Sequence, residues 1–427
     1  MIDDEAFRPI QYLGSKWRVL DHISAAMADL QDPRRPMVAD LFAGSGVVAR
    51  RLAQSSEVAA SDIQEYSRVL TAAVTAPVIP DVSLLLDNAQ VLLEAGGEAI
   101  ELLLVTEDSR LADPRWAQML AEDLESGAMV LGERAAPHAR QAAAKMSDSS
   151  GWTLLHHYGG VYFSYRQAAE LDAISCAIRD LPDPAARDTA LAALLGAASD
   201  LASSIGSHFA QPVRPTDRHG ALKTVTLSRL RGLRRRSVRV EFARRIERYK
   251  RLAPPPFAVR SIRADFRDAL SALPDEVGAI YADPPYTRDH YSRFYHVLET
   301  IARGDQPGLS EVTIHGRRQA SRGLYRIDRH QSPFSIVSQA PSAFATLFEA
   351  ARARDVAVLV SYSPVPDNEK PRARVVELSD LIELARAFFP RVELATVDGV
   401  RHSKFNRAGL NAPLVDEAEV LIAARPR

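Results

Sequence analysis

The chain has 427 residues, of which 46% are hydrophobic and 25% are charged, and its formal net charge is −1. This composition is that of a globular protein with an ample core, and no segment is long and apolar enough to span a bilayer. The single cysteine, Cys176, excludes a disulfide within the chain, and the first residues lack the features of a signal peptide, so we expect a cytoplasmic enzyme or binding protein.

The first predicted element is a helix that follows a turn of small residues. Residues 9–23, PIQYLGSKWRVLDHI, place Gly14, Ser15 and Lys16 at the start of an amphipathic pattern. Backbone amides at a helix start and a lysine ammonium can together hold a carboxylate. Taken alone, the same pattern also fits an ordinary solvated helix start.

Residues 37–75 read as a strand, a glycine turn, a helix and a second strand. The run DLFAGSGVVARRL places Gly44 and Gly46 in the first strand-to-helix turn, where glycine permits a positive φ and a close approach of a ligand. The third glycine of the dinucleotide-binding fingerprint is absent. Asp62 follows the second strand, where it either accepts hydrogen bonds from ribose hydroxyls or caps the next helix.

The alternation of strands and helices stops near residue 76 and resumes near residue 257. Alanine- and leucine-rich helical stretches fill the interval, and the candidate strands FAVRSI, GAIYA, VAVLVSY, RVELATV and AEVLIAA follow it. We predict an α/β fold with a Rossmann-like sheet, doubly wound and mostly parallel. Its two parts, residues 1–75 and 256–427, flank a mainly helical insertion at 76–255, which we expect to be a separate recognition region.

The insertion contains a strongly basic stretch between residues 214 and 251. Basic residues far outnumber acids there, which is the pattern expected of a surface that binds a phosphate backbone. The residues predicted to contact DNA are Lys223, Arg231, Arg234, Arg235, Arg236 and Arg239. A solvated basic helix is the alternative. A second basic segment, RHSKFNR at 401–407, is a further candidate for phosphate contact.

The segment AIYADPPYTRDHY at 279–291 ends a predicted strand in an acid, two prolines and a tyrosine. Each proline fixes its own φ and restricts the residue before it, so Asp283, Pro284, Pro285 and Tyr286 form a stiff loop. At the carboxyl end of a strand, this loop presents a carboxylate, carbonyl oxygens and an aromatic ring to one small volume, which suits a planar ring that carries an amino group. An ordinary strand-ending turn is the alternative.

The motifs occur in the order YLGSK, LFAGSG, an acid after the second strand, an insertion and DPPY. This order resembles that of the Dam-like (D12 class) adenine amino-methyltransferases, which modify DNA with S-adenosylmethionine. The resemblance implies that Asp283 and the carbonyl of Pro284 accept hydrogen bonds from the exocyclic amine, and that Tyr286 stacks on a base flipped out of the duplex. It also implies a set of residues that border the cofactor: Tyr12, Gly14, Lys16, Asp40, Phe42, Gly44, Gly46, Asp62 and Asp265.

We therefore expect an enzyme that methylates adenine in double-stranded DNA, in a restriction-modification or phage-defence setting, as a monomer without metal. Methyl transfer to the amine of cytosine and transfer to RNA are the alternatives among enzymes. A catalytically silent DNA-binding subunit is the alternative of another class. Ser361 and Tyr362, which end the VAVLVSY strand, are predicted to wall the target pocket.

Overall fold

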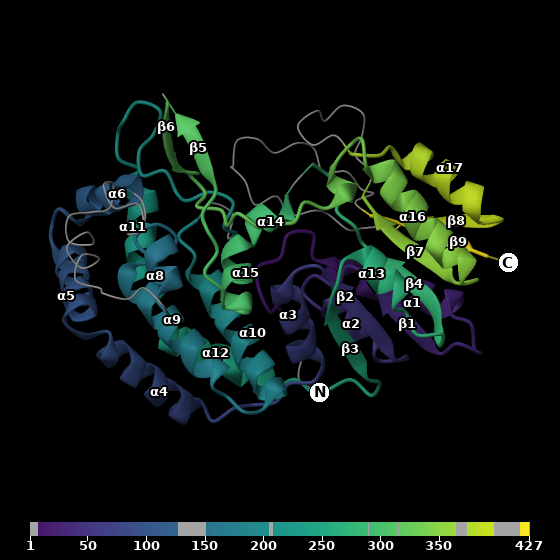
Figure 1. Ribbon diagram of the computed structural model, residues 1–427, viewed down its shortest axis with the longest axis horizontal. Helices are drawn as coiled ribbons and strands as arrows, with labels where there is room; N and C mark the ends of the chain where they lie inside the picture. The colour runs from purple at the N-terminus through teal and green to yellow at the C-terminus, as the bar shows by residue number, and fades with distance from the viewer. Residues whose placement is uncertain are drawn as a thin grey trace. The chain divides into compact units, whose positions relative to one another are not determined.

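The computed structural model describes residues 7–126, 151–204, 208–288, 290–314, 316–363, 374–396 and 419–426. The segment RHSKFNR at 401–407 lies outside these residues. The chain forms two compact units (Figure 1). Unit 1 contains Met1–Gln11, Val78–Leu252 and Arg293–Arg329, and unit 2 contains Tyr12–Pro77, Ala253–Ser292 and His330–Arg427. The first and last segments of unit 1 are ones that the sequence prediction placed with the sheet.

Unit 2 is built on a seven-stranded sheet in the order β3-β2-β1-β4-β7-β9-β8. The strands are β1 (Met37–Asp40), β2 (Val58–Asp62), β3 (Val259–Arg263), β4 (Val277–Ala282), β7 (Ala357–Tyr362), β8 (Arg391–Thr396) and β9 (Val420–Arg425). The helices are η2 (Lys16–Val19), α1 (Leu20–Leu30), α2 (Val47–Leu52), α3 (Glu65–Thr75), α13 (Phe266–Ser271), η4 (Pro333–Ser335), α16 (Ala340–Ala353) and α17 (Leu378–Phe388), and α14 (Tyr291–Phe294) crosses from unit 2 to unit 1. The predicted Rossmann-like α/β sheet is confirmed.

The sheet of unit 2 is apolar on both faces, as a strand sequence without polar alternation indicates. In β4, Ala279 and Tyr281 pack with helices α1 and α2, whereas Ile280 and Ala282 pack with α13, α16 and α17 on the opposite face. Helices therefore cover both faces, as Figure 1 shows.

The order of the strands reverses between β1 and β4, which are parallel neighbours. The chain builds outward from β1 to β2 before the insertion and adds β3 after it, and it then builds outward on the other side from β4 to β7. Ligands of open α/β sheets bind at such a reversal, beyond the carboxyl ends of the strands. The glycine turn follows β1 and the DPPY loop follows β4, so the two motifs meet at this point.

Two features of the strands differ from the simplest reading of the sequence. Strand β9 runs antiparallel to both β7 and β8, so its amino end lies at the edge where the other strands end. In unit 1, β5 (Glu311–Ile314) and β6 (Arg317–Ala320) form an antiparallel hairpin that the sequence analysis did not predict.

Among the described residues, no helix has the length and apolar character needed to cross a membrane.

Unit 1 is mainly helical. Its helices are α4 (Val82–Ala95), α5 (Gly97–Ala112), α6 (Trp116–Ser126), α8 (Thr153–Tyr158), α9 (Tyr165–Arg179), α10 (Pro184–Leu201), α11 (Thr224–Arg234), α12 (Val238–Lys250) and α15 (His296–Arg303). The side chains of Tyr158, Tyr162, Phe163 and Tyr165 are fully buried, as expected of core residues rather than of base-stacking ones. Burial of such large rings contributes much of the apolar area that stabilises the helical bundle.

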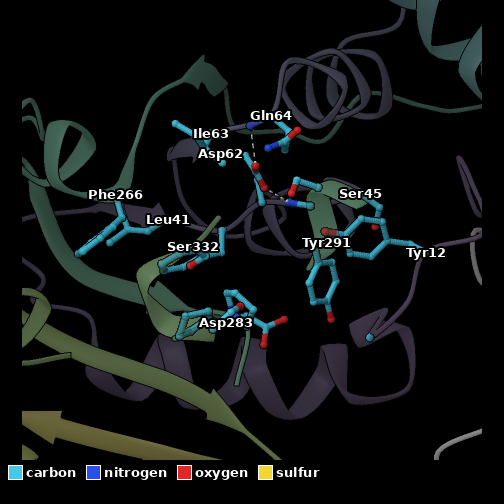
Figure 2. A pocket seen from close by; sticks show the side chains of 18 of the residues that line it. Tyr12, Leu41, Ser45, Asp62, Ile63, Gln64, Phe266, Asp283, Tyr291 and Ser332 are labelled. Atoms are coloured by element: carbon cyan, nitrogen blue, oxygen red, sulfur yellow. Dashed lines mark hydrogen bonds between the residues drawn. The ribbon is translucent and has the colours of Figure 1, made fainter. Parts of the chain in front are cut away.

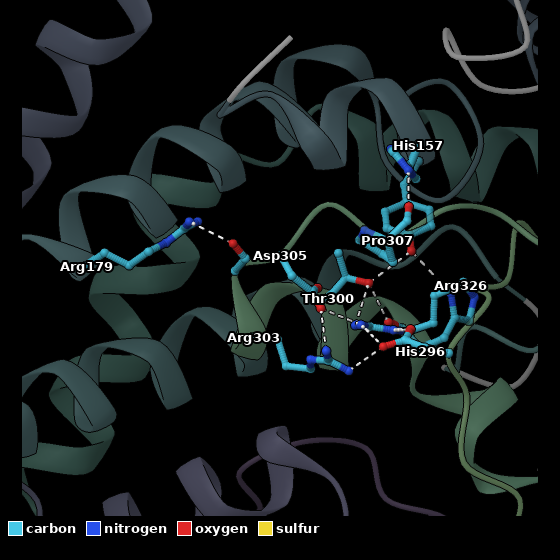
Figure 3. Close-up of polar contacts among 11 residues, drawn as sticks. His157, Arg179, His296, Thr300, Arg303, Asp305, Pro307 and Arg326 are labelled. Carbon is cyan, nitrogen blue, oxygen red and sulfur yellow. Dashed lines mark hydrogen bonds and ion pairs between the residues drawn. The ribbon is translucent and has the colours of Figure 1, made fainter.

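Arg326 ties the chain after the hairpin to the helices of unit 1 (Figure 3). Its side chain is only 1% exposed, and it pairs with Asp305 at 2.6 Å and with Asp328 at 2.7 Å. One of its terminal nitrogens also lies 3.4 Å from the hydroxyl of Thr300 in α15. A buried guanidinium is tolerated only when its donors are satisfied, and here two carboxylates and a hydroxyl satisfy them.

We predict that Arg326→Met destabilises unit 1 by about 2 kcal/mol, because it removes a buried guanidinium and its hydrogen bonds to two carboxylates, which keep only their contacts with Arg303. The matched control is Arg318→Gln in β6, where the arginine is 81% exposed and pairs with Glu311 at the surface. That change is expected to cost less than about 1 kcal/mol. Urea unfolding of both variants measures the difference, and equal midpoints would contradict the structural role of Arg326.

Candidate functional site

A cavity opens at the carboxyl ends of β1, β2 and β4, entirely within unit 2 (Figure 2). Its empty volume is about 1100 Å³, with open solvent at the mouth included, which is room for a nucleoside-sized ligand and a second ring. The predicted site residues that line it are Tyr12, Gly14, Lys16, Phe42, Gly44, Asp62, Asp265, Asp283, Pro284, Pro285 and Tyr286. The structure thus brings together four motifs that lie far apart in the sequence.

The glycine turn after β1 is fastened to the end of β2. The amide of Gly44 donates to a carboxylate oxygen of Asp62 at 3.0 Å, and the amide of Gln64 donates to the other oxygen at 2.9 Å. Gly44 has φ +55°, and a Cβ there would lie 3.0 Å from the ring of Tyr12. The backbone and the Tyr12 ring therefore leave space only for glycine, and Asp62 holds the turn while also facing the cavity.

Two acids at the cavity wall are suited to bind hydroxyl or amino donors. Burial raises the pKa of Asp62, and its hydrogen bonds with the amides of Gln64 and Gly44 oppose this shift. Asp62 precedes the N-cap of α3, which is Gln64, so it is not the helix cap considered from the sequence. Asp265 is the N-cap of α13 and accepts a hydrogen bond from the amide of Arg267 at 3.0 Å. Each acid thus has a fixed orientation.

An aromatic cluster forms another part of the cavity wall. The ring of Phe42 lies 6.2 Å from that of Phe266 and 5.4 Å from that of Phe334, and the last two rings are 4.9 Å apart. Phe42 and Phe266 line the cavity directly, and Asp265 adjoins them. An apolar wall beside a carboxylate suits a purine that carries an amino group.

The charged centre of the cavity consists of Lys16, Asp283 and Glu419. The ammonium of Lys16 lies 3.0 Å from Asp283 and 2.9 Å from Glu419. The side chains of Lys16 and Glu419 are 5% and 3% exposed, whereas that of Asp283 is 18% exposed. Lys16 and Asp283 both line the cavity, and Asp283 is the more exposed of the two, whereas Glu419 is outside the lining and pairs with Lys16.

The triad sets the protonation of Asp283. Burial raises the pKa of Asp283 to about 6, while the neighbouring ammonium of Lys16 lowers it and the carboxylate of Glu419 raises it. The pKa of Lys16 is well above its usual value, because the attraction of Asp283 and Glu419 outweighs the opposing effect of burial. At neutral pH Asp283 is therefore ionised beside the cationic Lys16, and its carboxylate is a hydrogen-bond acceptor.

Glu419 was missed by the sequence analysis for a topological reason. Site residues are expected at the carboxyl ends of parallel strands, whereas Glu419 immediately precedes the amino end of β9. Because β9 runs antiparallel to β7, its first residues lie beside the end of β7, where the hydroxyl of Ser361 donates to Glu419. The direction of the last strand was the information that the sequence did not provide.

Tyr286 lies between cations and another ring. The guanidinium carbon of Arg374 lies 4.8 Å from the ring centroid of Tyr286, and the ammonium of Lys16 lies 5.5 Å from it. The ring of Tyr362 is 5.4 Å away at an angle of 57°. Tyr362 therefore supports Tyr286 from β7, while Ser361 is fully buried and acts through Glu419.

Asp40 and Gly46 do not line the cavity, in contrast to the prediction that they border the cofactor. Asp40 is 0% exposed and accepts a hydrogen bond from the amide of Phe42 at 3.3 Å, so it shapes the turn. Burial raises the pKa of Asp40 to about 8. Gly46 is the N-cap of α2 with φ +77°, and its absent Cβ allows the turn to pack on α3.

The cavity also contains residues that the motifs did not identify: His290, Tyr291, Ser292, His330, Gln331, Ser332 and Ser335. The ring of Tyr291 lies 6.2 Å from that of Tyr12, and a Cβ on Gly14 would lie 3.1 Å from its hydroxyl. Tyr291 belongs to the tyrosine-rich segment that follows DPPY, which was the available signal in the sequence. The residues from 330 to 335 carried no recognisable pattern.

The prediction that Arg234 contacts DNA is wrong for this structure. Arg234 is 3% exposed and donates to the carbonyl of Gly160 at 2.7 Å within unit 1. The carboxylates of Glu107 and Asp123 lie near enough to raise its pKa, against the larger effect of burial. A guanidinium that neutralises buried acids is not available to a phosphate.

The other basic residues predicted to contact DNA also have partners within unit 1. Arg231 and Arg235 both donate to the carbonyl of Leu111, at 2.9 and 3.0 Å. Arg236 pairs with Glu241 at 2.6 Å, Arg239 donates to the carbonyl of Leu86 at 2.9 Å, and Lys223 donates to the carbonyl of Arg214 at 3.0 Å. These contacts hold the five side chains within unit 1, but only the contact of Arg236 is with a carboxylate, and the other four are with backbone carbonyls, which do not neutralise charge.

Comparison with known proteins identifies the same family that the order of the motifs resembles. The model of the D12 class N6 adenine-specific DNA methyltransferase family matches residues 12–98 and 243–337. A modification methylase named LlaI, from Lactococcus lactis subsp. lactis, is 39% identical over 120 residues, which are 28% of this chain and 15% of that protein. The resemblance inferred from the order of the motifs is thereby confirmed.

We predict that Gly46→Ala strongly destabilises unit 2. Gly46 has φ +77°, and a Cβ would lie 2.7 Å from the Cα of Thr71, so strain and a backbone clash would add. The matched control is Gly97→Ala, which has φ +66° but meets nothing within 4 Å and should cost only about 1–2 kcal/mol from strain. Urea unfolding of both variants measures the effect, and a smaller loss for Gly46→Ala than for Gly97→Ala would contradict the packing argument.

Proposed function

We propose that this chain, a member of the D12 class of N6 adenine-specific DNA methyltransferases, transfers a methyl group from S-adenosylmethionine to the exocyclic amine of adenine in double-stranded DNA. The observation that carries the proposal is the position of Asp283, which lines the cavity with its carboxylate 3.0 Å from the ammonium of Lys16. An ionised carboxylate beside a proline carbonyl and an aromatic ring is a receptor for an aromatic amine.

The residues of the cavity fit S-adenosylmethionine. Phe42 and Phe266 provide an apolar wall for the adenine, and Asp265 provides an acceptor for its amino group. Asp62 is positioned to accept the ribose hydroxyls, and the glycine turn at Gly44 leaves the backbone open to a close approach. When bound, the cofactor would supply an electrophilic methyl group on a sulfonium.

Lys16 has a role different from the binding of the cofactor carboxylate. Its ammonium already lies within 3.0 Å of two carboxylates, so its charge is balanced inside the protein. Its function is to orient Asp283 and to keep it ionised near neutral pH. The small-residue turn before Lys16, which includes Gly14, borders the cavity through its backbone.

The acceptor groups activate the amine. The nitrogen of an aryl amine is a poor nucleophile because its lone pair is delocalised into the ring. Hydrogen bonds from the amine to Asp283 and to the carbonyl of Pro284 draw its hydrogens out of the ring plane and return the lone pair to nitrogen. The proton that nitrogen loses on methylation leaves to solvent or to Asp283, and positioning supplies the rest of the rate enhancement.

Duplex DNA must deliver the base to this cavity by flipping it out of the stack, at a cost of a few kcal/mol. Stacking on Tyr286 offsets part of this cost, and Tyr362 and Arg374 fix the orientation of that ring. Unit 1 is the candidate for target recognition. The name of the relative, a modification methylase, supports a role in a restriction-modification system.

The test is single-turnover transfer from radiolabelled S-adenosylmethionine to a mixed-sequence duplex, followed by analysis of the nucleosides. Label is expected in methyladenine. Asp283→Ala should abolish transfer and leave cofactor affinity, measured by calorimetry, within a few-fold of wild type, because the carboxylate acts on the amine. Asp275→Ala, which changes a fully exposed aspartate of unit 2, is the control and should retain full activity. Label in methylcytosine, or full activity of Asp283→Ala, would contradict the proposal.

Tyr286 provides a separate prediction. Tyr286→Ala should weaken capture of the flipped base by about 1–3 kcal/mol, the usual value of stacking between a base and an aromatic side chain. Tyr286→Phe should have little effect, since the ring face and not the hydroxyl contacts the base. Titration with a duplex that carries a fluorescent base analogue measures the affinity, and equal losses in both variants would assign the role to the hydroxyl.

A further inference from the structure

Two arginines of unit 1, Arg329 and Arg293, lie against the ring of Tyr325, outside the helices of the basic stretch. The guanidinium carbons of Arg329 and Arg293 lie 4.8 and 5.6 Å from the centroid of the Tyr325 ring. The hydroxyl of Tyr325 donates to the carbonyl of Ala210, which fixes the ring. The ring is thus a rigid platform for two cations.

Arg322 and Arg214 extend this cluster. Gly323 follows Arg322, and a Cβ on Gly323 would lie 2.3 Å from the Tyr325 ring, so the backbone beside Arg322 passes against the same ring. Arg214 is close enough to Arg322 for its charge to lower the pKa of Arg322 further after the larger effect of burial. Burial lowers the pKa of Arg329, and the charge of Arg293 lowers it further.

The positive charge of this cluster is not balanced. Arg214, Arg293 and Arg322 are exposed and Arg329 is half-buried. In the part of the chain that the structure describes, no carboxylate is within 4.0 Å of any of these four guanidinium groups. By contrast, Arg326, three residues before Arg329, pairs with two carboxylates. Holding like charges together without acids costs free energy, and a bound anion would recover it.

We propose that Arg293 and Arg329, which lie against the ring of Tyr325, bind backbone phosphates of duplex DNA together with Arg322 and Arg214. The guanidinium fork matches the geometry of a phosphate, and several forks on one surface match a polymer that presents phosphates in series. The proposal rests on the proposed function, since it names the surface through which the same DNA substrate is held.

The sequence adds an argument for DNA over an unrelated anion. Arg293 directly follows Ser292, and Arg329 directly precedes His330, and both Ser292 and His330 line the cavity of unit 2. Among the basic residues of unit 1, these two are therefore the nearest in sequence to the predicted site of the flipped base. Phosphate contacts of this kind set the position of the duplex and carry no sequence information.

The experiment measures binding of a fluorescent mixed-sequence DNA duplex to the full chain by anisotropy, at a series of salt concentrations. Arg293→Gln, Arg322→Gln and Arg214→Gln are compared with Arg352→Gln, which changes an arginine that pairs with Asp355 on the surface of unit 2. Each lost phosphate contact should make the slope of log K against log salt shallower by about 0.9. The triple variant should therefore lose both affinity and salt dependence, and the control should lose neither.

The outcomes separate the two proposals. If wild type binds duplex DNA and the triple variant keeps the wild-type slope, the assignment of these arginines is overturned while the proposed function stands. If wild type binds neither duplex nor single-stranded DNA but binds S-adenosylmethionine by calorimetry, the proposed substrate fails instead. Tighter binding to an RNA duplex of the same sequence would overturn the DNA assignment. Circular dichroism of each variant identifies any loss of fold.

Discussion

The site depends on the ion pairs that Lys16 makes with Asp283 and Glu419. They join three segments that are far apart in the sequence: the helix start before β1, the loop after β4 and the residue before β9. An isolated buried carboxylate would be protonated, because burial raises its pKa. With Lys16 beside it, Asp283 has a pKa of about 6 and remains ionised at neutral pH despite the second acid. The ability of the DPPY loop to accept a hydrogen bond from an amine thus comes from a residue outside that loop.

The topology of the sheet explains why these groups meet. The strand order reverses between β1 and β4, so the glycine turn and the DPPY loop leave adjacent strands at the same edge. Asp62, at the end of β2, holds the glycine turn through the amide of Gly44 and faces the same cavity. The proposed cofactor side and the proposed acceptor side of the cavity are consequently the two sides of one reversal in strand order. An insertion between β2 and β3 leaves this arrangement intact.

The sequence predicted the sheet because its strands are apolar and bounded by turn residues, and it predicted the motif residues that line the cavity because the motifs follow those strands. It could not predict Glu419, because the antiparallel direction of β9 is decided by tertiary packing. It misassigned Asp40 and Gly46, since a motif does not show which of its residues face a ligand and which shape the turn. Arg234 was misassigned because composition does not distinguish a guanidinium that neutralises buried acids from one that faces solvent. The arginines near Tyr325 were overlooked because they are spread over a long stretch of sequence and so do not form a local cluster of basic residues.

The most direct test of the account is the pH dependence of single-turnover methyl transfer in wild type and in Glu419→Gln. Protonation of Asp283 removes the acceptor, so the wild-type rate should fall as the pH drops through about 6. The negative charge of Glu419 raises the pKa of Asp283, so its removal should move this fall to lower pH, while the rate above pH 7 changes less. A fall at the same pH in both proteins, or a shift to higher pH in Glu419→Gln, would contradict the claim that the Lys16 triad controls the acceptor carboxylate.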